Sequence, residues 1–180
     1  MYELHENEQY FYDASTLEQL ADFLSGFENP CCLCAPLVGK TLASRGAKVS
    51  VLDIDERFAS VTGFRRFDLF RPEWIGESFD VILCDPPFFK VSLSQLFFAI
   101  RLLSRHEYSQ PLLISYLKRR EANVMGTFTR FNLKPTGYFP AYQTVRSHAK
   151  NDIEFFSNLP EARVLCLRGE ARENLQSPGL

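Results

Sequence analysis

The segment Val81-Ile82-Leu83-Cys84-Asp85-Pro86-Pro87-Phe88 says most about the architecture of this 180-residue chain. Its first four residues form a short apolar run, which predicts a strand buried inside a parallel sheet. Open sheets of this type bind their ligands beyond the carboxyl ends of the strands. We therefore expect the acidic, proline-rich second half, Asp85 to Phe88, to lie at a ligand-binding site.

The four residues after this strand have the chemistry to hold an amine on a planar ring. Pro86 and Pro87 fix the backbone and donate no N–H group, so their carbonyl groups can face a cleft. The Asp85 carboxylate and the Pro86 carbonyl would accept hydrogen bonds from an –NH2 group, and the Phe88 ring would stack on a flat ring. The alternative is a strand that ends in a proline turn, with Phe88 buried in the core.

Strands alternate with helices along residues 14–117, a pattern typical of a doubly wound parallel sheet. The predicted helices are 14–24, 36–45 and 92–103, and the predicted strands are 31–35, 48–53, 64–69, 79–85 and 112–117. Beyond residue 120, Pro and Gly turns separate four short predicted strands, at 128–133, 137–142, 152–156 and 164–167. The predicted fold class is α/β, a mostly parallel sheet with an antiparallel edge and helices on both faces.

Acidic residues follow three successive predicted strands. Asp53 ends the second strand, where a carboxylate typically accepts hydrogen bonds from both hydroxyls of a nucleoside ribose. Asp68 follows the third strand, where it could accept from the exocyclic amine of an adenine or be an ordinary acid of a surface turn. Asp85 follows the fourth, whereas Asp55 is expected to cap the next helix. Together the three carboxylates would line one rim of the sheet, which is a more specific signal than any one of them.

The turn after the first strand lacks the glycines with which nucleotide-binding folds bring their backbone close to a ligand. Residues 34–41 end in Gly39-Lys40-Thr41 and match the Walker A pattern G-x-x-x-x-G-K-[ST], except that Cys34 replaces the first glycine. Such a loop binds phosphate through its backbone N–H groups, and Pro36 is a stiff residue inside it. A P-loop is therefore a remote alternative, in which Asp85 would be the Walker B acid.

Charge is distributed unevenly along the chain, although the net charge is −2. Residues 1–30 contain seven acids and no Lys or Arg, whereas residues 101–150 contain nine Lys and Arg and two acids. The basic stretch can attract an anionic partner such as nucleic acid, or it is simply a solvated face. We expect one domain over residues 1–180, with an acidic helical segment at 1–30 and a mobile tail at 168–180.

The cysteines and the apolar residues indicate whether to expect a metal site or a membrane span, and in which cellular compartment the protein works. Three of the five cysteines are Cys31, Cys32 and Cys34, and adjacent residues of a strand point to opposite faces, so a zinc site is not expected. They fit the core of a protein from a reducing compartment. The sequence contains no run of about 18 apolar residues, so no membrane span is predicted. The acidic amino terminus does not resemble a signal peptide. We expect a cytoplasmic protein without a metal or a membrane partner.

Five segments together resemble the N6-adenine methyltransferase-like family. They are Gln9–Asp13, Cys34–Pro36, Val51–Phe58, Asp85–Phe88 and Asn151–Asn158, and the resemblance extends over residues 8–158. In that order, they resemble the family's aromatic opening, its glycine-poor first turn, its second-strand motif, its catalytic motif and its closing strand. The family includes a zinc-finger-bearing enzyme that methylates an adenine of large-subunit ribosomal RNA, and the lysine methyltransferases of elongation factor 1A.

The resemblance implies a Rossmann-like class I methyltransferase that uses S-adenosylmethionine. By position, the cofactor-binding residues would be Tyr12, Ala35, Pro36, Asp53 and Asp68. Among them, Asp53 would hold the ribose of the cofactor and Asp68 its adenine, and the residues at 35 and 36 would border its methionine end. The catalytic set, which would hold the substrate amine, would be Asp85, Pro86, Pro87 and Phe88.

The first hypothesis from these residues is methyl transfer to the N6 amine of an adenine in nucleic acid, either RNA or DNA. The adenine would leave its stack, and Phe88 would replace part of the lost stacking. A protein lysine is the alternative substrate, because Asp85 could orient its amine and Phe88 could pack on its stem. A third reading is a non-catalytic partner of another methyltransferase, which the intact Asp85–Phe88 segment argues against. The chain has no zinc-binding modules like those of the ribosomal enzyme.

Overall fold

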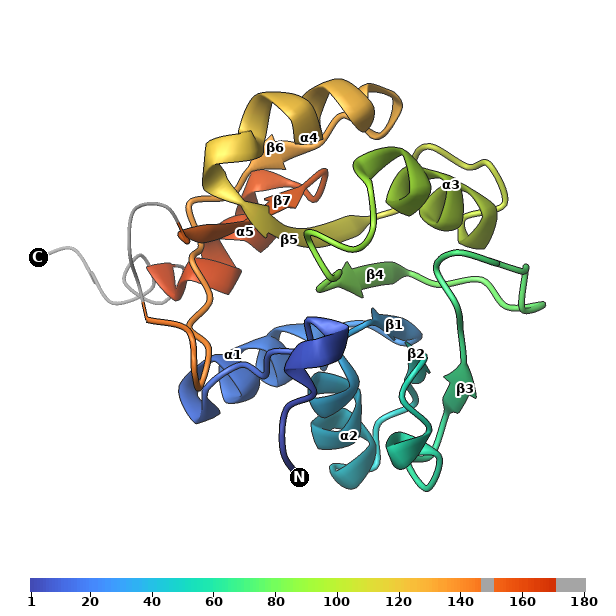
Figure 1. Ribbon diagram of the computed structural model, residues 1–180. Helices are drawn as coiled ribbons and strands as arrows, with labels where there is room; N and C mark the ends of the chain where they lie inside the picture. The colour runs from blue at the N-terminus through green and yellow to red at the C-terminus, as the bar shows by residue number, and fades with distance from the viewer. Residues whose placement is uncertain (147–150, 171–180) are drawn as a thin grey trace, which may run out of the picture.

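The strands of the computed structural model, which describes residues 1–146 and 151–170, form a sheet in the order β3-β2-β1-β4-β5-β7-β6 (Figure 1). Strands β1 to β5 run parallel, and β7 runs antiparallel to both β5 and β6. The strands are β1 Pro30–Leu33, β2 Ser50–Asp53, β3 Phe64–Arg66, β4 Val81–Cys84, β5 Leu112–Leu117, β6 Lys134–Pro135 and β7 Ile153–Ser157. The predicted α/β class, with a mostly parallel sheet and an antiparallel edge, is confirmed.

Helices lie on both faces of this sheet, as predicted. The α-helices are α1 Ala14–Leu24, α2 Pro36–Ser44, α3 Leu93–Leu103, α4 Glu121–Thr127 and α5 Glu161–Arg168, and the short 3-10 helices are η1 His5–Asn7, η2 Glu56–Phe58, η3 Lys118–Arg120 and η4 Thr129–Phe131. Helices α1 and α2 pack together on one face, where α5 contacts α1, while α3 and α4 pack together on the other (Figure 1). In the described part of the chain, no helix is long and apolar enough to cross a membrane.

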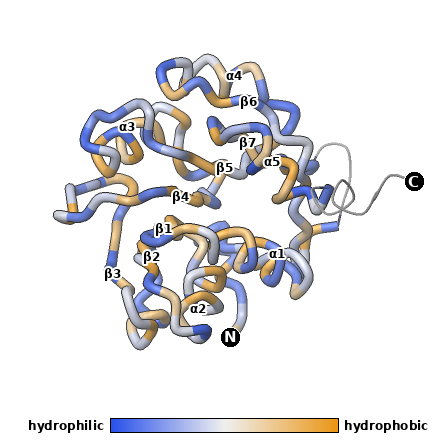
Figure 2. The backbone as a smooth tube through the Cα atoms, turned by 180° about the vertical axis from the view of Figure 1, so that it is seen from behind, coloured by the Kyte–Doolittle hydropathy of each residue, from blue (hydrophilic) through white to orange (hydrophobic). Residues whose placement is uncertain are grey.

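The central strands position the carboxyl ends that form the cleft. Strand β1 lies between β2 and β4, with Cys32 paired to Val51 on one side and to Leu83 on the other. Every residue of β1, β2, β4 and β5 is buried, and Figure 2 shows hydrophobic residues along β1, β2 and β5. Because the winding of the chain reverses on the two sides of β1, a crevice opens beyond the carboxyl ends of β1 and β4.

The N-terminal half follows the predicted pattern closely because its sequence signals are local. Helix α1 spans the predicted residues, and the side chain of Asp13 caps it by accepting a hydrogen bond from the Thr16 amide. Leu20, Ala21 and Leu24 are fully buried, as their helical spacing requires. The predicted strands before residue 118 are present, although each of the first four is shorter than predicted.

The predicted strand at 128–133 is wrong, because this region continues from α4 into η4. Phe128 and Phe131 are spaced three residues apart, and both rings pack edge-on against Phe97 of α3, with ring centroids 5.4 and 5.8 Å away. Aromatic residues favour strands, but at this spacing they share one face of a helical turn and bury it against α3.

Two further predicted strands are absent. Residues 137–142 run mostly irregularly between Gly137, whose φ is +73°, and Tyr142, which forms an isolated antiparallel bridge with Tyr12. The predicted strand at 164–167 is part of α5, where Val164 and Leu167 are buried at helical spacing. Helix α5 also includes residue 168, where the mobile tail was expected to begin, and residues 171–180 of that tail lie outside the described residues.

Candidate active site

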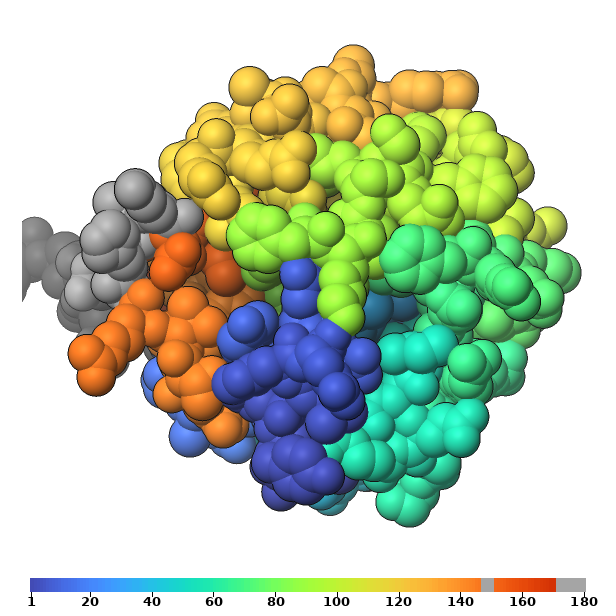
Figure 3. All heavy atoms as spheres, viewed as in Figure 1, coloured from blue at the N-terminus to red at the C-terminus, as the bar shows by residue number. Residues whose placement is uncertain are grey.

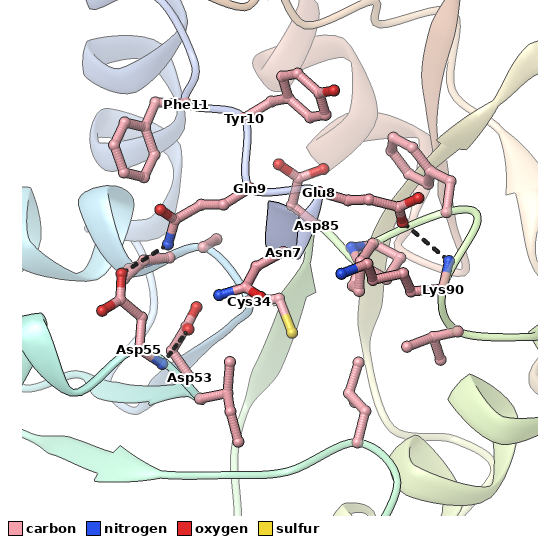
Figure 4. Close-up of a pocket in the computed structure, with 18 of the residues that line it drawn as sticks. Asn7, Glu8, Gln9, Tyr10, Phe11, Cys34, Asp53, Asp55, Asp85 and Lys90 are labelled. Atoms are coloured by element: carbon pink, nitrogen blue, oxygen red, sulfur yellow. Dashed lines mark hydrogen bonds between the residues drawn. The ribbon is translucent and has the colours of Figure 1, made fainter. Parts of the chain in front are cut away.

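A pocket of about 270 Å³ lies at the carboxyl ends of β1, β2 and β4. All nine residues predicted for the site line this pocket, which is also lined by residues 7–12. Figure 4 shows Cys34, Asp53 and Asp85 around it, with residues 7–11 running across. The structure therefore brings together side chains that are separated by more than 70 residues in the sequence.

Asp53 ends β2 and is buried beside the pocket. Its Oδ1 accepts a hydrogen bond of 2.8 Å from the Asp55 amide, and burial raises its pKa to about 6. Asp55 also lines the pocket, but its carboxylate already accepts from Arg57 and from Gln9 and caps η2. Asp55 is thus a capping residue, as predicted, and Asp53 is the carboxylate available to a ligand.

The turn between β1 and α2 is too short to be a P-loop. Cys34 adopts a positive φ of 55°, and α2 begins two residues later at Pro36. Gly39-Lys40-Thr41 therefore lies inside the helix, where the Thr41 hydroxyl donates to the Leu37 carbonyl. A Walker A loop must precede its helix to direct backbone N–H groups at phosphate, so the P-loop alternative is wrong. Ala35 and Pro36 instead present the compact start of α2 to the pocket.

Asp68 lies in the loop after β3, on the rim of the pocket. Its Oδ1 accepts a hydrogen bond of 2.9 Å from the Phe70 amide, so it caps its own turn. Asp68 is therefore an acid of a surface turn at the edge of the pocket, and its contact with an adenine stays a prediction.

Asp85 follows β4 and lines the pocket. In the sheet, β2 and β1 lie between β4 and β3, the strand that precedes Asp68. Oδ1 of Asp85 accepts two hydrogen bonds, one of 2.5 Å from the Ser115 hydroxyl and one of 2.8 Å from the Tyr142 hydroxyl. Burial raises the pKa of Asp85 to about 7, although these hydrogen bonds favour its charged form. A carboxylate with this pKa is a better proton acceptor at neutral pH than an ordinary aspartate.

The prolines and Phe88 form a firm wall beside this carboxylate. The Pro87 carbonyl accepts from the Val91 amide, whereas the Pro86 carbonyl accepts no hydrogen bond within the described residues. Phe88 is half-buried, and its ring packs edge-on against Tyr116, with centroids 5.2 Å apart. The wall therefore contains the Pro86 carbonyl, which has no hydrogen-bond donor within the described residues, and the Phe88 ring, which lines the pocket.

Residues 3–12, here called the N-terminal segment, close the pocket from the front, which the sequence did not predict. Gln9 donates to the Asp55 carboxylate on one side, and the Glu8 carboxylate accepts from the backbone amides of Phe89 and Lys90 on the other (Figure 4). Figure 3 shows this segment in dark blue at the middle of the face, between the cyan and lime-green parts of the chain. Tyr12, at its end, is buried next to Tyr142.

Solved methyltransferase structures share this fold at low sequence identity. A "putative RNA methyltransferase" from Pyrococcus horikoshii is 14% identical, with a TM-score of 0.59 over 88% of this chain and 91% of that one. Magnesium protoporphyrin IX methyltransferase from Synechocystis PCC 6803, solved with bound SAM, is 15% identical, with a TM-score of 0.53 over 81% and 79%. A TehB-like SAM-dependent methyltransferase from Corynebacterium glutamicum is 12% identical, with a TM-score of 0.54 over 79% and 88%.

The strand order, the glycine-poor cleft and the family match define an S-adenosylmethionine-dependent methyltransferase with a Rossmann-like fold. Within this class, the chain belongs to the family described as "Probable N6-adenine methyltransferase", whose sequence model matches residues 3–161. The match includes the pocket and the N-terminal segment in full. No curated protein matches the chain by sequence.

Proposed function

We propose that this protein transfers a methyl group from S-adenosylmethionine to the N6 amine of an adenine in nucleic acid. The observation that carries the proposal is the pairing of the Asp85 carboxylate with the unbonded Pro86 carbonyl at one end of the pocket. These are two acceptors for the two N–H groups of an exocyclic amine. The Phe88 ring lines the same wall and offers a face to a planar base.

The residues at the other end fit the cofactor. Asp53 is a buried carboxylate beside the pocket, and it is suited to accept from the two hydroxyls of a ribose. Asp68 would accept from the adenine amine, and Ala35 and Pro36 would border the methionine end. Tyr12 lines the same pocket near Asp85, and we expect it to contact the cofactor. When bound, the cofactor supplies a methyl group on a positively charged sulfur.

The protein would accelerate the transfer mainly through position and hydrogen bonding. The lone pair of an aromatic amine is delocalised into its ring, so the amine is a weak nucleophile. Hydrogen bonds to Asp85 and to the Pro86 carbonyl would localise that lone pair and direct it at the methyl carbon. The sulfonium of the bound cofactor would supply the methyl carbon and would keep the electron pair of its C–S bond. The amine then loses one proton, which Asp85 is placed to accept.

The rim near Asp85 supports nucleic acid as the substrate. Phe89, next to the catalytic segment, is 71% exposed, and an exposed ring can stack on a base. Arg119 and Arg120 are exposed in η3, at the carboxyl end of the strand next to β4. Neither forms an ion pair within the described residues, whereas Lys118 is neutralised by Glu121 and Glu154. Two guanidinium groups without an acidic partner favour contact with phosphate, and that of Arg120 also lies over the Tyr116 ring, 6.0 Å from its centroid.

The test is the incorporation of radiolabelled methyl groups from S-adenosylmethionine into a lysate of cells that lack this gene. We expect nuclease, but not protease, to release the label, and digestion to nucleosides to yield N6-methyladenosine or its deoxy form. The Asp85→Ala variant should lose transfer and retain cofactor binding, whereas Asp22→Ala, which removes an exposed acid of α1, should retain both. Label that only protease releases would identify a protein substrate and overturn the proposal.

A further inference from the structure

Three hydroxyl groups from distant parts of the chain gather around Asp85. The Ser115 hydroxyl comes from β5, the Tyr142 hydroxyl from the segment that precedes β7, and the Tyr12 hydroxyl from the N-terminal segment. The first two donate to the same carboxylate oxygen, Oδ1, at 2.5 and 2.8 Å. The Tyr12 hydroxyl is buried beside them without a hydrogen bond of ordinary geometry, but it too favours the charged form of Asp85.

The backbone fixes these side chains in place. Tyr12 and Tyr142 form a β-bridge, and their rings lie 4.8 Å apart. Both residues are buried, and Ser115 is fully buried in the middle of a central strand. Since none of the three has room to turn, the hydrogen bonds to Oδ1 set the rotation of the carboxylate about its Cβ–Cγ bond.

We propose that Ser115 and Tyr142 are positioning residues, which hold Oδ1 of Asp85 so that Oδ2 is presented to the methyl-accepting amine. The inference rests on the proposed function. A free carboxylate presents either oxygen, and its lone pairs can point away from the amine. With two donors on one oxygen, the other oxygen is the acceptor that remains for the substrate. The arrangement also keeps the carboxylate pre-oriented before substrate arrives, which lowers the entropy lost in reaching the reactive geometry.

The electrostatic surroundings of Asp85 make this role measurable. The titratable groups that face it are Tyr12, Tyr142, Cys34 of the first turn and Cys84 of β4. None of these is a cation, so the hydrogen bonds are the interactions that favour the charged form against burial. Removal of one donor should therefore raise the pKa of Asp85 above about 7.

The decisive variants are Tyr142→Phe and Ser115→Ala, assayed for methyl transfer between pH 6 and pH 9. Each should lower kcat by about fivefold to tenfold at pH 7, because one hydrogen bond to a charged group is lost. The acidic limb of the kcat profile should move to higher pH, and activity should recover toward pH 9. The affinity for S-adenosylmethionine should stay unchanged, and Ser115→Thr should retain activity because it keeps the hydroxyl.

Tyr138→Phe is the matched control, because Tyr138 lies in the same segment and its hydroxyl donates to Gln19 away from the pocket. This variant should keep the wild-type profile. A uniform loss of activity at every pH for both Tyr142→Phe and Ser115→Ala, with no shift of the acidic limb, would assign them a purely structural role and overturn the inference.

A direct titration separates this inference from the proposed function. The pKa of Asp85 can be followed by carboxyl 13C NMR in the wild type and in both variants, without any substrate. A higher pKa in the variants supports the positioning role even if the methyl acceptor is a protein. An unchanged pKa would rule that role out, whatever the acceptor is. If Tyr142→Phe fails to fold, Ser115→Ala alone decides the outcome.

Discussion

Two carboxylates at the pocket, Asp53, which is buried, and Asp85, which is half-buried, have raised pKa values of about 6 and about 7. In both cases burial is the largest cause, because the charged form is poorly solvated beside an apolar core. Such groups cost stability whenever they are ionised, and proteins retain them where function needs the charge. The cost has a definite pH dependence, since an unfolded aspartate titrates near its ordinary value.

At the residue scale, we predict that Asp85→Asn stabilises the protein at pH 8. The pKa of Asp85 is about 7 in the folded protein and 3.8 for an unperturbed aspartate, so between those two pH values the folded state binds a proton that the unfolded state does not. Stability from this group therefore falls as pH rises through that window and is lowest above about pH 7. The neutral amide still accepts from Ser115 and Tyr142. We expect a gain of about 1–3 kcal/mol at pH 8.

Urea denaturation at pH 8 and pH 5 would measure this effect. The gain should shrink at pH 5, where the wild-type carboxyl group is already mostly protonated when folded. Asp22→Asn, at an exposed position of α1, should change stability little at either pH. Equal or lower stability of Asp85→Asn at pH 8 would contradict the prediction.

At the scale of elements, the packing of α2 against β2 depends on a missing side chain. A Cβ at Gly39 would lie 2.4 Å from Cγ2 of Val51, which is far inside van der Waals contact. Gly39 is buried in α2, so its missing side chain lets the helix lie close to the sheet at this point. The close approach also brings the start of α2, at Pro36, to the edge of the pocket.

We predict that Gly39→Ala destabilises the protein by about 1–3 kcal/mol, because overpacking outweighs the better helix propensity of alanine. Gly126→Ala is the matched control, since Gly126 lies in α4 and a Cβ there would meet nothing within 4 Å. This control should be neutral or stabilising by up to about 1 kcal/mol. Urea titration of both variants decides the matter, and a stable Gly39→Ala protein would refute the packing argument.

Helices and strands were predictable where local sequence signals determine them. They were not predictable where contacts with distant parts of the chain determine the secondary structure. The helix at 14–24 and the strand at 112–117 follow from hydrophobic spacing and caps. Phe128 and Phe131 are aromatic residues, which favour strands. They lie in a helical turn instead, because in that conformation both rings pack against Phe97 of α3. Only the three-dimensional structure shows that α3 lies opposite them.

The residues of the site also divide into those that the sequence predicts and those that only the structure shows. The nine predicted residues all line the pocket, because the carboxyl ends of parallel strands meet at one edge of the sheet. Their assigned roles remain predictions. Ser115 and Tyr142 were missed, although a lone polar residue in the buried strand 112–117 was a usable signal for the first. Tyr142 and Glu8 carry no such signal, because their partners lie 57 and 81 residues away.

At the scale of the whole molecule, the N-terminal segment connects the two halves of the cleft. Gln9 binds the β2 side through Asp55, and Glu8 binds the β4 side through the amides of Phe89 and Lys90 at 3.0 and 2.9 Å. Glu8 has a positive φ of 53°, and its Lys90 partner also donates to the Glu6 carbonyl. The segment therefore lies across the pocket, and we expect it to slow the departure of a cofactor bound there.

We predict that Glu8→Gln accelerates the release of S-adenosylmethionine by about threefold to tenfold, because two charge-assisted hydrogen bonds are weakened. Glu6→Gln makes the same change of charge two residues away, where only the backbone carbonyl is used, and it should release the cofactor at the wild-type rate. Stopped-flow competition with excess S-adenosylhomocysteine would measure both rates. Equal rates for Glu8→Gln and the wild type would show that the segment does not retain the cofactor.

The bridge between Tyr12 and Tyr142 also sets the order in which the protein can be completed on the ribosome. The amide of Asp13 donates to the Ala141 carbonyl, and the amide of Gln143 donates to the Phe11 carbonyl. Residues 11–13 are therefore synthesised early, and their hydrogen-bond partners follow about 130 residues later. Until residue 143 has left the exit tunnel, a nascent chain can pair β1, β2 and β4 and can bond Glu8 to the amides of Phe89 and Lys90, yet Tyr12 lacks its bridge and Asp85 lacks the Tyr142 donor.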